Sequence, residues 1–204
     1  MKTDIYTLAH EIKNPLCIVK GYLEMMNSDN FMKYKEVIKN EVNTSLMILD
    51  NYLEYNKISI QKEEIDLNLL IIDIKESVYD YLKKRNIHFK VKLVDEEIYL
   101  EADYNKLKQV IYNIIKNSVE AKSKNIELLY NVLYDRIEII VKNDGMKIDL
   151  TTIDKIGNNY SSKILGNGIG LTISKKIIEL HNGKITYRNN EKRGVSTIIT
   201  LYSA

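Results

Sequence analysis

The amino-acid sequence predicts an α+β protein: an N-terminal antiparallel helical hairpin over residues 1–58, followed by an α/β sandwich with a mixed sheet over residues 61–204. Two observations predict this class. In the first part, apolar residues recur every three or four positions, which is the spacing of a helix that packs in a bundle. In the second part, short alternating apolar runs typical of strands are interleaved with helical patterns. A chain of 204 residues is long enough for one large domain or two small ones.

Two apolar stripes predict the hairpin. The first stripe consists of Ile5, Leu8, Ile12, Leu16, Val19, Leu23 and Met26. The second stripe consists of Phe31, Tyr34, Ile38, Val42, Ser45, Leu49 and Tyr52. The short polar segment 27–30 between them predicts a tight antiparallel connection. Because a lone hairpin would expose its stripes, we expect a second copy to cover them in a homodimeric four-helix bundle.

The second part mixes helical and strand patterns. Helices are expected over residues 66–85, 104–121 and 168–181. Strands are expected over residues 87–94, 98–102, 126–132, 136–142, 184–189 and 195–202. Asp103 stands where an N-cap belongs, and Asn182-Gly183 has the composition of a C-cap. This order of elements favours a mixed sheet with helices on one face.

Composition excludes several classes of protein. The 30 Lys and Arg residues nearly balance the 28 Asp and Glu residues, and no long basic block indicates a nucleic-acid partner. The single cysteine, Cys17, excludes an internal disulfide framework and a Cys-rich zinc site. No apolar run approaches the roughly 20 residues that span a bilayer, and no signal peptide is visible. We therefore expect a soluble, cytoplasmic chain with no membrane segment.

The first motif is the run His10-Glu11-Ile12-Lys13-Asn14-Pro15-Leu16 in the first helix. His10 lies off the apolar stripe, so we expect it to face solvent, and Asn14 shares its face one turn later. An exposed imidazole beside the Glu11 carboxylate can act as a nucleophile with a general base. Such a pair also arises by chance on protein surfaces. Pro15 inside the helix costs about 3 kcal/mol and predicts a bend just beyond His10.

Two asparagines occupy one face of the helix over residues 104–121. Asn113 and Asn117 are four positions apart, with apolar neighbours that mark the core side. Carboxamide oxygens suit a hard cation such as Mg²⁺, which also takes water and phosphate oxygens. Two solvated asparagines would give the same pattern.

Two glycine-bearing segments follow. Asn143-Asp144-Gly145 comes directly after a strand, where a side-chain oxygen can accept from an amino group of a ligand; it also fits a plain turn. The run Gly166-Asn167-Gly168-Ile169-Gly170-Leu171 opens a helix, where backbone N–H groups can face an anion. Lys163 lies three residues upstream and can meet a phosphate as a point charge.

Taken together, these motifs resemble the catalytic core of the two-component sensor histidine kinases. Residues 10–16 resemble the H-box, 107–121 the N-box, 141–148 the G1 box, 160–163 the end of the F-box, 166–171 the G2 box, and 194–201 the closing strand. The resemblance extends over essentially all of the chain, in the family's order. It implies a HisKA-type dimerisation and phosphotransfer hairpin followed by a GHKL (Bergerat-type) ATP-binding domain.

The resemblance also implies a reaction and roles for residues. It implies ATP with Mg²⁺, autophosphorylation of His10, and transfer of the phosphoryl group to an aspartate of a response-regulator receiver domain. Glu11 is implied as general base or acid, and Asn14 as the residue that orients water for regulator dephosphorylation. Magnesium is implied at Asn117, with Asn113 in support. Contact with the nucleotide is implied for Lys163, Gly166, Gly168, Gly170, Leu171 and the segment Asn143-Asp144-Gly145.

The chain departs from the family pattern in the G1 box. Where the family has an aspartate that binds the adenine amino group, this chain has Asn143, and Lys147 replaces the second glycine. Asparagine accepts a hydrogen bond without charge assistance. Asp144 would take its place if the loop shifted by one residue. The departure bears on nucleotide affinity and base selectivity.

Three other functions compete with a kinase. The first is a histidine phosphotransferase that relays phosphate through His10 while its ATP domain is degenerate, which Asn143 favours and the glycine run disfavours. The second is an anti-sigma-like binding module, which has no need of an exposed His-Glu pair. The third is an ATPase of the gyrase or mismatch-repair kind, which would place a catalytic Glu where this chain has Asn113.

Overall fold

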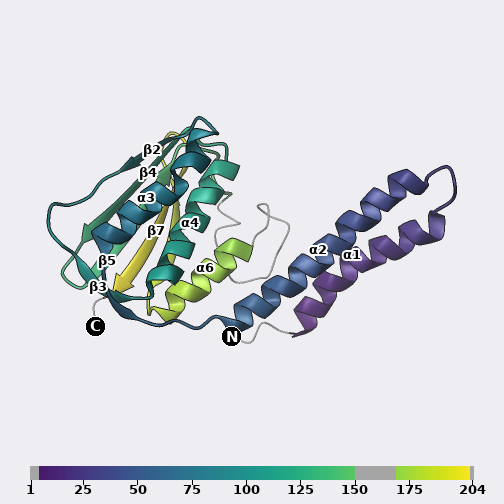
Figure 1. Cartoon of the computed structure of the whole chain (residues 1–204), viewed down its shortest axis with the longest axis horizontal. Coiled ribbons are helices and arrows are strands. Elements are labelled where there is room, and N and C mark those ends of the chain that lie inside the picture. Colours follow the sequence, from purple (N-terminus) through teal and green to yellow (C-terminus); the bar gives the residue numbers. More distant parts are fainter. Residues whose placement is uncertain (1–4, 150–168, 203–204) are drawn as a thin grey trace. The chain divides into compact units, whose positions relative to one another are not determined.

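The structure is a computed structural model that describes residues 5–149 and 169–202. The chain divides into two compact units, residues 1–58 and residues 59–204. The first is a helical hairpin and the second a mixed sheet with helices (Figure 1), so the predicted α+β class is confirmed. Among the described helices, none combines the length and the hydropathy needed to cross a membrane.

The hairpin consists of α1 (Ile5–Met25) and α2 (Phe31–Lys57). Its turn is held by side-chain amides: Asn27 Oδ1 accepts from the backbone N–H groups of Asp29 and Asn30, at 3.0 and 3.1 Å. In turn, Asn30 Oδ1 accepts from Asn27 N at 2.8 Å, and Asn30 Nδ2 donates to Met25 O at 3.0 Å. Such Asx contacts stabilise a tight reversal and explain why the polar segment ends one helix and starts the next.

The hairpin buries only part of its apolar stripes. Leu8 and Ile48 are buried between the two helices. The large apolar side chains that remain exposed are Leu16, Ile18, Leu23, Met25, Phe31, Met32, Val42, Leu46, Leu49 and Leu53. Two helices offer each other only one face each, so a single hairpin leaves the rest of its apolar surface in water.

The second unit is built on a five-stranded sheet. Its strands are β2 (His88–Val91), β4 (Asn125–Val132), β5 (Arg136–Asn143), β6 (Lys184–Asn189) and β7 (Val195–Tyr202), in the order β2-β4-β5-β7-β6. β2 runs parallel to β4 and all other pairs are antiparallel. The helices α3 (Leu67–Lys83), α4 (Tyr104–Glu120) and α6 (Ile169–Leu180) cover one face of the sheet (Figure 1).

The core lies between that face and the helices. The strand register aligns Leu128 with Val141 and Val141 with Thr197, so alternate residues of the central strands face the helices together. The largest fully buried side chains of the unit are Leu67, Leu70, Ile71, Ile74, Leu82, Leu107, Ile111, Ile115, Ile126, Leu128, Ile139 and Ile177. This core holds α4, which carries both asparagines of interest.

Three local features differ from the expectations. A strand, β1 (Glu63–Asp66), pairs with β3 (Tyr99–Ala102) in a separate two-stranded sheet, whereas the sequence indicated no strand before α3. α3 begins at Leu67 and not at Asp66, because the Asp66 carboxylate caps it, accepting from Asn68 N and Leu69 N. β2 ends at Val91 and not at residue 94, because Val94 N donates to the Tyr130 hydroxyl at 3.2 Å, away from the sheet ladder.

Candidate functional site

The hairpin contributes an exposed histidine and a half-buried carboxylate in adjacent positions of α1. The His10 side chain is exposed, as the stripe predicted, and so is Asn14 one turn further on. Helix α1 continues through Pro15. An imidazole in this position is open to a macromolecular partner.

Glu11 differs from an ordinary surface carboxylate. Its Oε2 atom is buried and has no hydrogen-bond partner among the described residues. Burial raises the pKa of Glu11, because the charged form loses hydration that no donor replaces. A raised pKa makes this carboxylate a better proton acceptor than a fully solvated one. The pair therefore combines an accessible nitrogen with a neighbouring base.

The second part of the site lies where α4 packs against the start of α6. Asn113 Nδ2 is 3.4 Å from both Gly170 O and Ser174 Oγ, and the Ser174 hydroxyl donates to Gly170 O at 2.6 Å. Asn117 is one turn further along α4, and its Nδ2 is buried without a partner within the described part of the chain. A buried amide group without a partner is unfavourable by about 1–3 kcal/mol, so it points to a ligand or water that completes it.

Asn143 and Asp144 occupy different environments at the end of β5. Asn143 is buried; its Nδ2 donates to Ser118 Oγ at 3.2 Å and its Oδ1 accepts from Gly145 N at 3.0 Å. The Asp144 carboxylate instead accepts from Lys124 N, Asn125 N and the Asn125 side chain, at 2.7–2.9 Å. Burial opposes the charge of Asp144, but these donated hydrogen bonds outweigh it and hold its pKa below the usual value. Asp144 thus ties the strand ends together, and Asn143 is the residue that faces α4.

Two glycines let the chain pass closely at this point. A Cβ on Gly145 would lie 2.5 Å from Ala121 O and 2.6 Å from Ser123 Oγ. Gly194 has a φ of +86°, and a Cβ there would lie 1.8 Å from Asn143 O. Only glycine fits such approaches. The turn after β5 is therefore held between the end of α4 and the turn before β7.

Several predicted site residues cannot be placed. Lys163, Gly166 and Gly168 lie outside the described residues. Gly170 and Leu171 are in the first turn of α6, where Gly170 faces Asn113: a Cβ on this glycine would lie 3.5 Å from the Asn113 side chain. Within the α/β unit, Gly170 lies against Asn113, Asn117 is one turn further along α4, and Asn143 contacts Ser118 of the same helix. His10, Glu11 and Asn14 lie in α1 of the hairpin.

Sequence analysis missed the two serines of the site. Ser118 is buried and receives the Asn143 amide, while its own hydroxyl donates to Ile114 O at 2.9 Å. Ser174 is buried beside Asn113. Each serine stands among the apolar positions of its helix, and this was the signal in the sequence that could have identified it. The amide oxygens of Asn113 and Asn117 suit a cation bound to phosphates, and the N–H groups at the start of a helix suit the phosphates themselves.

Comparisons with known proteins match both units of the chain. Residues 5–60 match the family model of the His Kinase A (phospho-acceptor) domain. Residues 102–203 match the model of the histidine kinase-, DNA gyrase B- and HSP90-like ATPase. The chain is 28% identical to sporulation kinase B of Bacillus subtilis over 206 residues, covering 96% of this chain and 48% of that protein.

Solved structures of histidine kinases match this fold. The catalytic domain of histidine kinase ThkA matches with a TM-score of 0.65 and 31% identity, over 71% of this chain and 99% of that one. Histidine kinase ThkA in complex with the response regulator protein TrrA matches with a TM-score of 0.71 and 30% identity, over 96% of this chain and 60% of that one. The chain spans about half the length of the curated relatives sporulation kinase B and DegM.

Proposed function

Because the chain belongs to the histidine kinase family, we propose that it is an ATP-dependent protein-histidine kinase that phosphorylates His10 and passes the phosphoryl group to an aspartate of a response regulator. The observation that carries the proposal is the exposed His10 beside the half-buried Glu11, in a chain that also carries an ATPase-like unit. ThkA, to which the chain is similar, was solved in complex with a response regulator.

In this proposal the hairpin supplies both nucleophile and base. A neutral His10 nitrogen attacks the γ-phosphorus of ATP, the bond from that phosphorus to the ADP oxygen breaks, and the imidazole releases the proton of its other nitrogen. Glu11 accepts that proton, for which its raised pKa suits it. ATP supplies the phosphoryl group, and Mg²⁺ screens its developing charge.

The α/β unit would hold the nucleotide. Asn117 and Asn113 offer amide oxygens to a cation bound to phosphates. The buried Asn117 Nδ2, which has no partner among the described residues, is a donor that a phosphate oxygen could accept. Gly170 exposes the first turn of α6 to phosphate oxygens. Asn143 has one lone pair of its Oδ1 left after the bond from Gly145 N, enough to accept one amino hydrogen of a base.

The direct test is labelling with [γ-³²P]ATP and Mg²⁺ of the full chain. We expect protein-bound label that is acid-labile and base-stable, as a phosphoramidate requires. His10→Gln should eliminate the label and keep nucleotide binding, measured with a fluorescent ATP analogue. Asn117→Ala should lose both, because the amide that completes the cation site is gone. Asn105→Ala, an exposed asparagine of the same helix, is the matched control.

Two results would contradict the kinase proposal. Label that persists in His10→Gln would mean that His10 is not the phosphoryl acceptor. Absence of label in the wild-type chain, combined with phosphate uptake by His10 from a phosphorylated receiver domain, would favour the phosphotransferase with a degenerate ATP domain.

Asn14 supports a second activity, removal of phosphate from the regulator. It is exposed one helical turn from His10, so both face the same docked receiver, where an amide can orient water. Asn14→Ala should keep autophosphorylation and lengthen the lifetime of regulator phosphate in the presence of ADP. Equal lifetimes would assign Asn14 a structural role.

The exposed apolar side chains of the hairpin support a homodimer. Leu16, Leu23, Leu46 and Leu53 are exposed in the single chain. Covering them with a second hairpin would gain about 25 cal/mol per Å² of apolar area. We expect light scattering to give twice the chain mass at micromolar concentration, and one chain mass would contradict the homodimer.

A further inference from the structure

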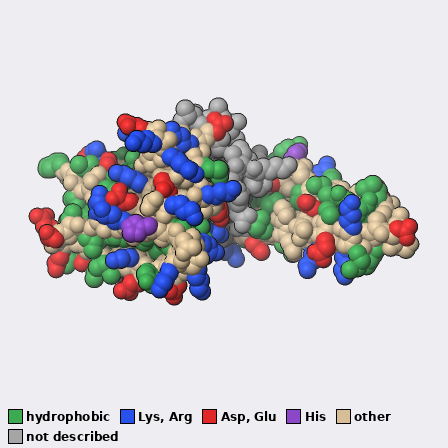
Figure 2. Space-filling view, turned by 90° about the horizontal axis from the view of Figure 1, so that it is seen from above, with side chains coloured by type: hydrophobic (Ala, Val, Ile, Leu, Met, Phe, Trp, Pro, Cys, Tyr) green, Lys and Arg blue, Asp and Glu red, His purple; other side chains and the backbone are tan. Residues whose placement is uncertain are grey.

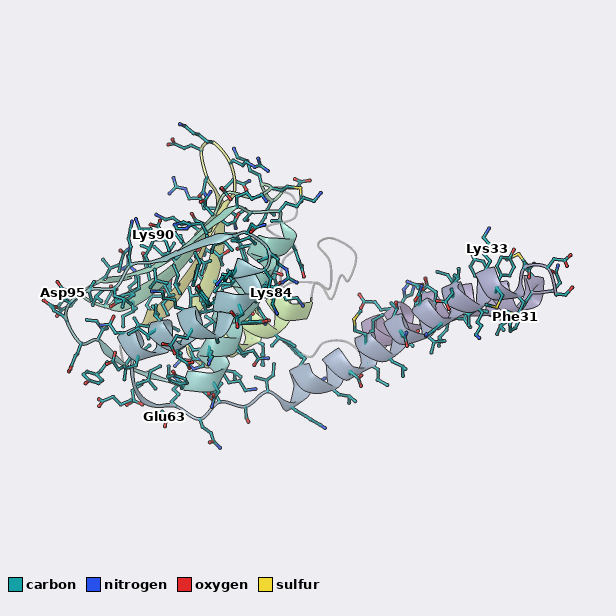
Figure 3. The ribbon with its side chains drawn as sticks, turned by 45° about the horizontal axis from the view of Figure 1, so that its top comes forward. Phe31, Lys33, Glu63, Lys84, Lys90 and Asp95 are labelled. Atoms are coloured by element: carbon teal, nitrogen blue, oxygen red, sulfur yellow. The ribbon has the colours of Figure 1, made fainter. Side chains whose placement is uncertain are left out.

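The outer edge of β2 offers unpaired backbone groups. Within the described part of the chain, β2 pairs with β4 alone. His88 N donates to Lys124 O at 2.8 Å and Lys92 N donates to Leu128 O at 2.9 Å, so the even-numbered residues direct their N–H groups at β4. Because successive residues of a strand alternate, Phe89 and Val91 direct theirs at the open edge. Figure 3 shows Lys90 on this outer strand and Asp95 in the segment that follows it.

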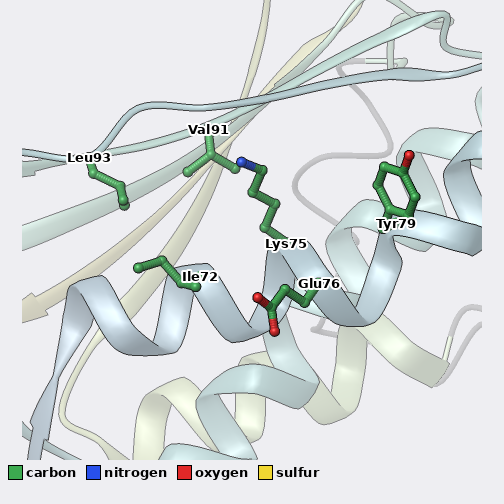
Figure 4. Close-up of a pocket in the computed structure, with 6 residues that line it drawn as sticks. All are labelled: Ile72, Lys75, Glu76, Tyr79, Val91 and Leu93. Carbon is green, nitrogen blue, oxygen red and sulfur yellow. The ribbon is translucent and has the colours of Figure 1, made fainter.

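A groove runs beside this edge, between β2 and α3 (Figure 4). Its volume is about 350 Å³, and it is lined by Ile72, Lys75, Glu76, Tyr79, Val91 and Leu93. The apolar side chains of α3 that line it remain exposed: Ile72 is 38% and Tyr79 is 58% exposed. Thus α3 carries a second apolar face in addition to the one that it buries in the core.

The two faces beside this edge differ in charge: Lys75 and Glu76 both line the groove, whereas lysines predominate on the opposite face of the sheet. Lys75 extends across the groove toward Val91 (Figure 4) and makes no ion pair with the described residues. On the other side of the edge, the ammonium groups of Lys90 and Lys92 share one carboxylate, Glu127, which is 2.8 Å from Lys92. Figure 2 shows many Lys and Arg side chains on the visible face of this unit. On that face of the sheet, Glu127 is one carboxylate among Lys90, Lys92 and Lys142, which leaves an excess of cations beside β2.

We propose that the β2 edge is a docking site for an extended acidic segment of a partner protein, which adds a strand to the sheet. Its backbone would pair with Phe89 and Val91. Its apolar side chains would enter the α3–β2 groove, and its alternate acidic side chains would face Lys90 and Lys92. A second copy of this chain fits less well, because pairing β2 with β2 would bring lysines of like charge together.

The probe is a blocked hexapeptide, Glu-Val-Glu-Val-Glu-Val, added to the full chain, with Lys-Val-Lys-Val-Lys-Val as matched control. Amide hydrogen exchange is followed by NMR. The acidic peptide should slow exchange of the Phe89 and Val91 amides at least about tenfold and leave the other edge strand, β6, unchanged. Equal protection by the basic peptide, or protection at β6 instead, would overturn the proposal, as would no protection; lysines that merely guard an edge against pairing would give that last result.

Variants test separately what charge and what backbone hydrogen bonds contribute to peptide binding. The double variant Lys75→Glu/Lys90→Glu should bind the acidic peptide about tenfold more weakly, whereas Lys184→Glu on β6 should bind as wild type. Val91→Pro removes an outward N–H and should abolish binding. A peptide N-methylated at its central valine tests the same hydrogen bonds without altering the protein. Unchanged affinity in the double variant, or for the N-methylated peptide, would refute strand addition. His10 labelling should be unaffected by the double variant, which keeps this test separate from that of the kinase.

Discussion

The hairpin and the α/β unit differ in how completely they bury their apolar side chains. The α/β unit encloses its large apolar side chains between a sheet and three helices, and Leu67, Leu70, Ile71 and Leu107 are completely buried. The hairpin leaves five residues of its apolar stripes exposed: Leu16, Leu23, Phe31, Val42 and Leu49. The difference also appears at the helix starts: Asp66 and Asp103 cap α3 and α4 with side-chain hydrogen bonds, whereas Asn30 makes none to α2. One unit is stable through its own contacts, and the other depends on what covers it.

The comparison also separates two kinds of unpartnered polar atom. The Glu11 oxygen in the hairpin and the Asn117 amide nitrogen in the α/β unit are the two buried side-chain atoms without a hydrogen bond among the described residues. Both belong to residues that the sequence motifs single out. A buried polar atom without a hydrogen bond lowers stability, and such atoms are concentrated at functional sites.

The largest expected effect is at Gly194. Gly194→Ala should destabilise the α/β unit by more than about 4 kcal/mol, because its Cβ would lie 1.8 Å from Asn143 O at a φ of +86°. Gly21→Ala in the hairpin is the control: nothing lies within 4 Å of its Cβ, and α1 should gain about 1 kcal/mol. Thermal unfolding followed by circular dichroism measures both. An unchanged transition in Gly194→Ala would contradict the close approach.

Core truncation should distinguish the two units next. Leu107→Ala, at 0% exposure, should cost about 2–5 kcal/mol in urea unfolding. Leu46→Ala, at 54% exposure, should change the unfolding of a single hairpin by less than about 1 kcal/mol. It should instead shift the monomer–dimer equilibrium on dilution, measured by sedimentation. An unchanged monomer–dimer equilibrium in Leu46→Ala would mean that this exposed apolar surface of the hairpin is not an interface.

Helix capping gives a smaller contrast. Asp103 Oδ1 accepts from Lys106 N at 3.0 Å and its Oδ2 accepts from Gln61 N at 2.8 Å. Asp103→Ala should therefore lower the stability of the α/β unit by about 1–2 kcal/mol. Asn30→Ala should lower that of α2 by less, because Asn30 makes no capping bond to the helix. Chemical denaturation of the two variants compares the caps, and the reverse order would refute this account of the helix starts.

The smallest effect is a pH dependence confined to the α/β unit. His181 is buried; its Nε2 accepts from Asp103 N at 2.9 Å, and its Nδ1 lies 2.7 Å from Ile177 O. Burial is the main reason that the pKa of His181 is lowered; the Lys62 charge lowers it further, against the opposing effects of Ile177 O and Asp103. The unfolded chain therefore binds a proton first, and stability should fall as the pH drops below about 6.5.

A control variant at His88 distinguishes the effect of His181 from that of an exposed histidine in the same unit. His181→Asn should remove the loss of stability between pH 7 and pH 5, while His88→Gln, at an exposed position, should keep it. Denaturant midpoints at a series of pH values measure the slope. A slope that survives in His181→Asn would assign the effect to other groups.

Much of the fold was predictable from the sequence, because its signals are local. Periodicity located both helices of the hairpin and the three described helices of the second unit, and Asp103 marked the start of α4 as an N-cap does. β1 was not predictable: Glu63–Asp66 has a single buried apolar residue, Ile65, and becomes a strand only because β3 lies beside it. Strand pairing between distant segments leaves little trace in the local pattern.

The candidate site likewise has features that local sequence patterns predict and features that depend on contacts between distant segments. The sequence by itself determined which residue types stand on one helix face, since the spacing of Asn113 and Asn117, or of His10 and Asn14, is a property of the helix. Only the tertiary structure decided what they meet. It placed Ser118 against Asn143, turned the Asp144 carboxylate toward Lys124 and Asn125, and brought Gly194 against the Asn143 backbone. These contacts join residues that are 19 to 51 positions apart, and packing of the whole sheet and its helices sets them, which no local pattern encodes.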